Sequence, residues 1–267
     1  MQQGAGVPAR SADGALRGER MATILVRLRE HGEVHATDLA AEFGVSQATL
    51  RRDLAILEEQ GLCTRRYGGA VPTESSTELP VAYRDRRSQK QKAAVAKAAA
   101  DLLPPGPQTV GFTGGTTTSE IARVLSKRVD LVVVTNALNI ASEMAAKPRI
   151  RVVVSGGVAR SQSTELVGPW AESALAQASI GTAYIGVDGL DLAAGLTTHD
   201  TVEARTNAVL LERAERVVVV ADSSKIGRVL PGHIAPVSAM QVLVTDDGIT
   251  TEVLAALMAA GVEVVIA

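Results

Sequence analysis

Arg51 and Arg52 form an adjacent arginine pair in a stretch with helical periodicity. Guanidinium groups near the start of an exposed helix are suited to double-stranded DNA, because the major groove, about 12 Å wide, admits a helix whose side chains reach base edges and phosphates. We predict that Arg51 reaches base edges together with Gln47 and Thr49. Arg52 is expected to meet a phosphate, and the adjacent Asp53 to orient a neighbouring arginine.

Two helices must position this pair. The segment from Ala36 to Phe43 has helical character and ends at Gly44, which suits the left-handed conformation of a helix terminus. Ser46 is expected to cap the second helix, Gln47 to Gln60, and to lie among the DNA contacts. The apolar residues of that helix recur at helical spacing, namely Leu50, Leu54 and Leu57. An arginine pair on a helix usually marks a solvated face, but the succession of helix, glycine turn and capped helix favours a DNA-reading module.

A short basic segment follows the second helix. Leu62 to Val71 contains Arg65, Arg66 and Tyr67, followed by two glycines, and this pattern predicts a small hairpin, or wing. We expect the three side chains to press against the DNA backbone. The first helix of the same module is expected over Glu19 to Arg29, where apolar residues again recur at helical spacing.

A glycine- and threonine-rich turn suggests a second kind of chemistry. It follows an expected strand and leads into an expected helix, so its backbone amides and hydroxyls would converge with the helix dipole on an anion such as a phosphate. The alternative is that the turn is only a tight connection. The residues concerned are Gly114, Gly115, Thr116, Thr117 and Thr118.

Polar residues also follow other expected strands. In an open α/β sheet, ligands bind at the carboxyl ends of the strands. Lys225 would supply a point charge to a phosphate, whereas the acidic and amide side chains would bind sugar hydroxyls. For Asp188 and Asp222 the alternative is a capping carboxylate, and for Glu203 a partner of the helix dipole. The candidates beside the loop are Asn136, Gly156, Gly157, Asp188, Gly189, Glu203, Asp222 and Lys225.

The chain beyond Ala93 alternates short apolar strands with helices, which is typical of a parallel sheet covered on both faces. Hydrophobic residues make up 46% of the chain and aromatic residues only 2%, a composition that suits buried parallel strands. The expected strands are Thr109–Phe112, Leu131–Val134, Arg151–Val154, Ala183–Val187, Val217–Ala221, Val242–Val244 and Val262–Ile266. The expected helices are Gln89–Leu102, Ser119–Ser126, Leu138–Ala146, Ala171–Gln177, Thr201–Glu215 and Thr250–Ala259.

The run VSQATLRRDLAILEEQGLCTRRYGGAV, from Val45 to Val71, resembles the winged helix-turn-helix of DeoR-type bacterial transcriptional regulators. The later runs GGTTTSEIA, VTNALNIASEM, YIGVDGLDLAAGLTTHDTVEA and VVVADSSKIGR resemble the effector-binding domain of that family, whose fold is similar to ribose-5-phosphate isomerase. The resemblance implies a phosphorylated sugar effector, with the Gly114–Thr118 loop and Lys225 around its phosphate, and repression relieved by that ligand. The chain departs from the family at Tyr67, where a histidine is common, and at Thr113 and Gly114, where an Asp-Ser pair is common.

A chain of 267 residues has room for two domains. We predict a flexible tail over residues 1–18, a winged helix-turn-helix domain over 19–72, a linker over 73–88 and an α/β effector domain over 89–267. The single cysteine, Cys63, excludes an intramolecular disulfide, and His199 has no ligand partner at metal-site spacing, so neither a metal nor a cofactor is expected. The apolar runs are too short to span a membrane and no signal-peptide pattern is present, so we expect a cytoplasmic protein without a membrane partner.

The formal net charge is only −2, so binding to DNA would depend on a local basic patch and on matched half-sites held by a homo-oligomer. We expect a DNA-binding transcriptional regulator without catalytic residues, a repressor of a sugar-metabolism operon that binds double-stranded operator DNA and is released by a phosphorylated sugar. One alternative is a sugar-phosphate isomerase-like enzyme with an accessory DNA-binding module, because the acids and Lys225 also suit acid–base chemistry. Another is a regulator whose sensor has lost its ligand.

Overall fold

The computed structural model describes residues 12–73, 78, 80–84 and 89–267. The chain divides into two compact units, Met1–Arg87 and Ser88–Ala267, which are described separately here as the N-terminal unit and the C-terminal unit.

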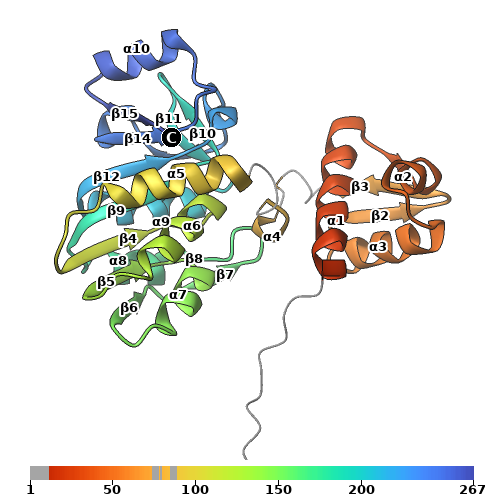
Figure 1. The fold of residues 1–267 in the computed structure, drawn as a ribbon, viewed down its shortest axis with the longest axis horizontal. Helices are drawn as coiled ribbons and strands as arrows, with labels where there is room; N and C mark the ends of the chain where they lie inside the picture. Colours follow the sequence, from red (N-terminus) through yellow and green to blue (C-terminus); the bar gives the residue numbers. More distant parts are fainter. Residues whose placement is uncertain (1–11, 74–77, 79, 85–88) are drawn as a thin grey trace, which may run out of the picture. The chain divides into compact units, whose positions relative to one another are not determined.

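The N-terminal unit packs helices around a small antiparallel sheet (Figure 1). Its buried side chains come from the first two helices, from the apolar face of the third and from the sheet, so the third helix is fixed with its opposite face exposed. The sheet has the strand order β1-β3-β2. Its elements are α1 (Ala12–His31), β1 (Val34–His35), α2 (Ala36–Phe43), α3 (Gln47–Glu59), β2 (Cys63–Arg66), β3 (Gly69–Pro72) and α4 (Val81–Arg84).

Two boundaries of this unit differ from the sequence-based expectation. The first helix begins at Ala12 rather than Glu19, so residues 12–18 of the expected tail are helical, while residues 1–11 lie outside the described residues. Arg17 in this added part pairs with Asp53 of α3, a contact between distant residues that periodicity does not reveal. Within the expected linker, α4 is helical and Tyr83 donates a hydrogen bond to Gln60 at 2.5 Å.

The C-terminal unit is built on a seven-stranded sheet in which every pair of neighbouring strands is parallel. The strand order is β15-β14-β12-β9-β4-β5-β6. The expected α/β fold class and all seven expected strands are confirmed. The strands are β4 (Gln108–Phe112), β5 (Leu131–Thr135), β6 (Ile150–Val154), β9 (Ile180–Gly186), β12 (Ala214–Val220), β14 (Val242–Thr245) and β15 (Glu263–Ile266).

Helices cover both faces of this sheet, because its strands are apolar on both sides. One buried cluster joins α5, α6 and α7 to one face, and a second joins α8, α9 and α10 to the other (Figure 1). All six expected helices are present. They are α5 (Gln89–Asp101), α6 (Thr116–Leu125), α7 (Leu138–Ala145), α8 (Pro169–Leu175), α9 (Thr201–Glu212) and α10 (Thr251–Ala259).

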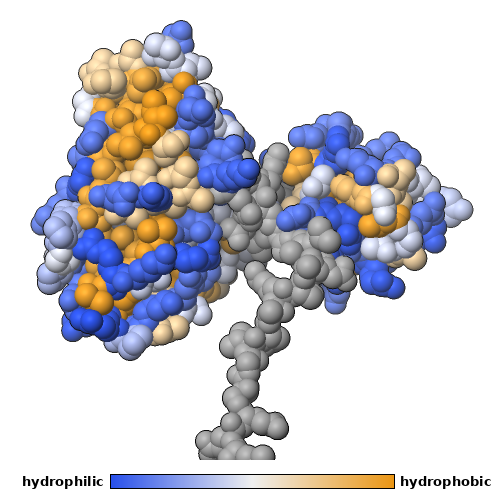
Figure 2. All heavy atoms as spheres, in the orientation of Figure 1, coloured by the Kyte–Doolittle hydropathy of each residue, from blue (hydrophilic) through white to orange (hydrophobic). Residues whose placement is uncertain are grey.

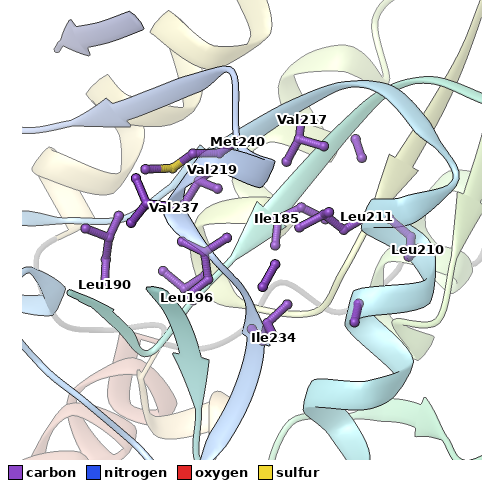
Figure 3. Packing of buried hydrophobic residues seen from close by; sticks show 14 of the residues in the cluster. Ile185, Leu190, Leu196, Leu210, Leu211, Val217, Val219, Ile234, Val237 and Met240 are labelled. Carbon is purple, nitrogen blue, oxygen red and sulfur yellow. The ribbon is translucent and has the colours of Figure 1, made fainter. Parts of the chain in front are cut away.

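Several short elements were not expected from the sequence. Segments of three or four residues are too short for an alternating pattern to stand out. Figure 3 shows Leu190, Leu196 and Ile234 of a small antiparallel sheet packed with Ile185 and Val219 of the main sheet. The additional elements are the hairpin β7 (Val158–Arg160) and β8 (Glu165–Val167), the small sheet β10 (Gly189–Asp191), β11 (Gly195–Thr198) and β13 (Gly232–Ala235), and the 3₁₀ turns η2 (Ser223–Lys225) and η3 (Val237–Ala239).

The order of the main sheet reverses direction between β4 and β9. From β4 the chain moves outward to β5 and β6, and it then returns to β9 on the other side of β4 before continuing to β12, β14 and β15. This reversal is a topological switch point, and in open α/β sheets ligands bind at the carboxyl ends of the strands at such a point.

In the part of the chain that the structure describes, no helix has the length and apolar character needed to cross a bilayer.

Candidate functional site

The helix-turn-helix geometry expected from the sequence is present in the N-terminal unit. Gly44 ends α2 in the left-handed conformation, with φ of +63°, and the Ser46 hydroxyl accepts a hydrogen bond from the Thr49 amide at 3.2 Å. Both features are local, because a glycine C-cap and a serine N-cap satisfy backbone groups at the two helix ends. Together they fix where α3 begins.

The face of α3 opposite its buried leucines carries the predicted DNA contacts. Gln47, Arg51 and Arg52 are exposed, and Gln47 and Arg51 are four residues apart on one side of the helix. Thr49 is half-buried, and its hydroxyl lies 3.0 Å from the Ser46 hydroxyl, so these two side chains take part in the cap. Gln47 and the two arginines are thus the exposed members of the predicted contacts on α3.

Asp53 does not orient a neighbouring arginine as expected. Its side chain is buried, and its two carboxylate oxygens accept hydrogen bonds from Arg17 at 3.1 Å and Arg20 at 2.7 Å. The expectation was wrong because Asp53 lies on the inner face of α3, next to Leu54, and meets α1 rather than solvent. It ties the candidate reading helix to the first helix of the unit.

The predicted wing is the hairpin β2–β3, closed by a turn at Tyr67 and Gly68. Arg65 is held by Glu58 of α3, which accepts hydrogen bonds from the Arg65 side chain at 2.6 Å and from its backbone amide at 2.8 Å. These hydrogen bonds lower the pKa of Glu58. Arg66 and Tyr67 are exposed near the turn, so they are the wing side chains with the greater freedom to meet a phosphate.

In the C-terminal unit, hydrogen bonds join predicted effector residues into two groups at the carboxyl ends of the strands, and the two groups meet where Glu165 contacts Glu203. We call the two groups together the polar cluster. It contains the predicted residues Gly114, Asn136, Asp188, Glu203 and Lys225 and four residues that the sequence did not indicate, Arg160, Glu165, Thr198 and Asn207.

One part of the polar cluster centres on Asp188 and Glu203. The Thr198 hydroxyl donates to Glu203 at 2.7 Å and lies 3.2 Å from Asp188. The Lys225 ammonium lies 3.3 Å from the other oxygen of Asp188, and the Arg160 guanidinium donates to Glu203 at 3.0 Å. Each of the two acids therefore has a cationic partner, an arrangement suited to binding a ligand that carries both hydroxyls and negative charge.

The other part centres on Glu165, which is buried between α9 and the Gly114 loop. Its carboxyl group accepts a hydrogen bond from the Gly114 amide and lies 3.4 and 3.5 Å from the Asn207 amide nitrogen. Asn136 in turn donates to Asn207 at 2.9 Å. Burial raises the pKa of Glu165 well above its ordinary value, and the neighbouring charge of Glu203 raises it further.

The loop at Gly114 is shaped by its two glycines. Gly115 has φ of +132°, which favours glycine, and its carbonyl oxygen accepts hydrogen bonds from the Thr118 and Ser119 hydroxyls at 3.0 and 2.6 Å. A Cβ at Gly114 would lie 2.5 Å from the Cγ atom of Glu165. The loop therefore needs glycine at Gly114 for the carboxyl group of Glu165 to approach so closely. Thr116 and Thr117 are half-buried in the first turn of α6.

Other predicted effector residues have structural contacts of their own. Asp222 caps η2 by accepting a hydrogen bond from the Ser224 amide at 3.1 Å, which is the capping alternative considered above. Gly156 and Gly157 adopt positive φ after β6, and Gly157 lies close to Val167 and Ala171. Gly189 pairs with Thr197 in the small sheet. The structure therefore brings Asp188, Glu203 and Lys225 together. The residues with a local structural role instead are Asp222, Gly156, Gly157 and Gly189.

Sequence reasoning missed Glu165 and Asn207 for different reasons. Asn207 lies four residues after Glu203 on α9, so helical spacing was a usable signal. Glu165 lies in a three-residue strand, and a glutamate there is expected to be exposed. Within the described ranges, no group of three or more His, Cys, Asp or Glu side chains is placed to hold a metal ion.

Comparison with known protein families gives two matches. Residues 20–76 match the DeoR-like helix-turn-helix domain, and residues 87–247 match the DeoR C terminal sensor domain. The second match alone spans more than half of the chain.

Curated relatives are similar over nearly their whole length. A protein of Escherichia coli O157:H7, whose name links it to transcriptional repression of the aga operon, is 39% identical over 93% of this chain and 93% of its own length. The HTH-type transcriptional regulator GlpR of Haloferax volcanii is 35% identical, over 94% of this chain and 98% of its own. The glycerol-3-phosphate regulon repressor of Escherichia coli K12 is 31% identical, over 84% and 88%.

Among solved structures, ribose 5-phosphate isomerase from Plasmodium falciparum aligns with 51% of this chain and 52% of its own, at 15% identity and a TM-score of 0.37. The family assignment does not depend on this distant likeness. It rests on the two domain matches and on the relatives that share 31 to 39% of their residues with this chain. The resemblance seen in the sequence motifs is confirmed, and this chain belongs to the DeoR family of transcriptional regulators.

Proposed function

We propose that this protein represses a sugar-metabolism operon by binding operator DNA through α3 and the wing, and that a phosphorylated sugar bound at the polar cluster releases it. The observation that carries the effector part is the polar cluster itself. Gly114, Asp188, Glu203 and Lys225 come from separate segments of the chain, yet contacts through Glu165 and Thr198 connect them at the point where the sheet order reverses.

The DNA part of the proposal rests on the exposed face of α3. Arg51 and Arg52 are exposed, and the described residues offer neither of them an ion-pair partner. Both guanidinium groups are therefore available to a duplex, Arg51 for base edges and Arg52 for phosphate. Gln47 lies on the same side of the helix as Arg51 and adds a donor and an acceptor.

Release requires that the effector bind better to the protein conformation that fits DNA less well. A coupling free energy of about 1 to 3 kcal/mol is typical and changes operator affinity roughly fivefold to 150-fold. The test begins with selection of binding duplexes from a random DNA library. Gel shifts on the selected duplex then follow the addition of glycerol 3-phosphate and of pentose, hexose and amino-sugar phosphates.

The expected result is one selected sequence family and release by one class of phosphosugar, but not by the matching unphosphorylated sugar. Failure to select any sequence contradicts the DNA part, and indifference to every phosphosugar contradicts the effector part. We propose binding rather than catalysis at the polar cluster. A coupled isomerase assay on the same phosphosugars checks this, and turnover would favour the enzyme alternative.

We further propose that the active form is a homo-oligomer, so that two N-terminal units meet matched half-sites. Figure 2 shows apolar side chains at the surface of the C-terminal unit between α10 and α5. Met258 of α10 and Ile266 of β15 are 62% and 49% exposed, and apolar side chains of this kind are often covered by a second copy. Light scattering on the purified chain measures the state directly, and a monomer at the concentrations that bind DNA would contradict the proposal.

A further inference from the structure

Glu165 holds the position at which the proposed phosphate would meet the Gly114 loop. Its carboxyl group accepts a hydrogen bond from the Gly114 amide, one of the backbone donors offered by the turn before α6. The side chain is only 1% exposed, so this contact is built into the fold rather than made by chance at the surface. The carboxyl group of an acidic side chain therefore occupies a donor that an incoming anion needs.

The surroundings of Glu165 disfavour the ionised form of its carboxyl group. Glu203 and Asn207 of α9 face its carboxyl group together with the Gly114 amide. The guanidinium group of Arg160, in β7, donates a hydrogen bond to Glu203 at 3.0 Å and lies 3.5 Å from Asp200. Thr198 of β11 also donates to Glu203, and Lys225 pairs with Asp188 beyond it. Glu165 is thus held by the Gly114 and Asn207 amides and by a side-chain hydrogen bond with Glu203, and ionisation of its carboxyl group is costly in this buried place.

A second observation points to a ligand. Asn136 is fully buried and donates to Asn207, but within the described residues its side-chain oxygen has no hydrogen-bond partner. Buried polar atoms are normally satisfied, and a donor is what this oxygen needs. The hydrogen-bond chain from Gly114 through Glu165 and Asn207 therefore ends at the side-chain oxygen of Asn136. A sugar hydroxyl is a suitable donor for this oxygen.

We propose that Glu165 is an internal competitor for the effector's phosphate: its carboxyl group holds the Gly114 amide until an anion displaces it. This inference rests on the proposed function. It makes Glu165 a specificity-determining residue, because an anion forms a stronger hydrogen bond with a backbone donor than a neutral sugar does and is therefore better able to replace the carboxyl group. Displacement of Glu165 from the Gly114 amide would shift the β7–β8 hairpin, because this hairpin carries both Glu165 and Arg160.

Sulfate is a suitable probe, because its charge stays constant through the range in which the Glu165 carboxyl group titrates. Calorimetry measures sulfate affinity of the full chain for wild type, Glu165→Gln and a matched control, Glu215→Gln. The control removes the same charge from an exposed position near the start of β12, at the opposite end of the sheet from the polar cluster. Glutamine keeps the size of Glu165 and cannot ionise.

Above the raised pKa of Glu165, we expect Glu165→Gln to bind sulfate about tenfold more tightly than wild type, which corresponds to about one pKa unit of like-charge interaction. Wild-type affinity rises as the pH falls and Glu165 is protonated, whereas the affinity of Glu165→Gln changes less with pH. Glu215→Gln follows wild type. The wild-type pH profile tests the inference even if Glu165→Gln does not fold, because a flat wild-type profile contradicts it.

The outcomes separate this inference from the proposed function. Equal affinity and equal pH profiles in wild type and Glu165→Gln overturn the role of Glu165 and leave the anion site standing. Sulfate binding to none of the three proteins overturns the anion site, and the inference with it. The Gly114 amide resonance in glycine-labelled protein gives an independent readout: it should shift with both pH and sulfate in wild type, but mainly with sulfate in Glu165→Gln.

Discussion

The Nε atom of Arg20 lies 2.7 Å from a carboxylate oxygen of Asp53, and this ion pair fastens α3 to α1 in the interior of the N-terminal unit. The Asp53 side chain is 2% exposed and that of Arg20 13%, so the pair is largely removed from water. Arg17, at 3.1 Å, adds a second and more exposed partner. Asp53 thus adds a polar link between α1 and α3 to their apolar packing.

Asp53→Asn should destabilise the N-terminal unit by about 3 kcal/mol, because removal of one partner leaves the Arg20 charge buried without compensation. Hydrogen exchange of the α3 amides in the full chain measures the effect locally. Glu59→Gln, an exposed change on the same helix, is the control and should leave exchange unchanged. Unchanged protection of α3 in Asp53→Asn would contradict this prediction.

Arg51→Ala should abolish the preference for the selected duplex over a scrambled one, with a loss of about 1 to 3 kcal/mol if Arg51 reads a base pair. Arg52→Ala should weaken binding to both duplexes alike. It should also reduce the slope of log affinity against log salt concentration by about one. Fluorescence anisotropy at several salt concentrations distinguishes the two effects. Native discrimination by Arg51→Ala would exclude that side chain as the reader.

Lys225→Ala should leave DNA binding intact but weaken binding of the releasing phosphosugar, by roughly tenfold or more. The change removes a cation and leaves Asp188 without the ammonium that lies 3.3 Å away. Calorimetry with the phosphosugar measures the affinity, and Lys225→Arg, which keeps the charge, should recover part of it. The same affinity in Lys225→Ala and wild type would place the phosphate elsewhere.

The stability of the C-terminal unit should fall as the pH rises through the raised pKa of Glu165. The ordinary glutamate pKa is 4.5, and burial together with Glu203 raises it in the folded chain, so the folded state retains a proton that the unfolded state has released. This contribution to stability is complete below the unfolded pKa and is lost above the folded one. Urea unfolding over a pH series measures it, and Glu165→Gln should flatten this part of the profile. An identical slope in the variant would assign the effect to another group.

Cys63 should react slowly with iodoacetamide in the folded protein. Burial raises the pKa of its thiol to about 11, so the nucleophilic thiolate is scarce at neutral pH. Mass spectrometry should find little alkylation under native conditions and complete alkylation in denaturant. Rapid native labelling would show that the N-terminal unit opens readily around β2.

The sequence predicted the parts of the fold that depend on local or periodic patterns. Gly44 and Ser46 mark their helix ends through backbone chemistry within a few residues, and the apolar strands of the main sheet repeat in alternation with helices. The partners of Asp53 and Glu165 were not predictable in this way. Arg20 lies 33 residues from Asp53, and Gly114 lies 51 residues from Glu165, so only the tertiary structure brings these charges to their partners.

The strand order of the C-terminal unit also affects how the chain folds while it is being translated. Strands β4, β5 and β6 are neighbours in both sequence and space, so they can pair as soon as residues 108–154 emerge. The second edge of β4 has no partner until β9, which begins at Ile180, has been translated. A nascent chain thus exposes an apolar strand edge in the middle of its future sheet, and that interval is where chaperone protection would matter most.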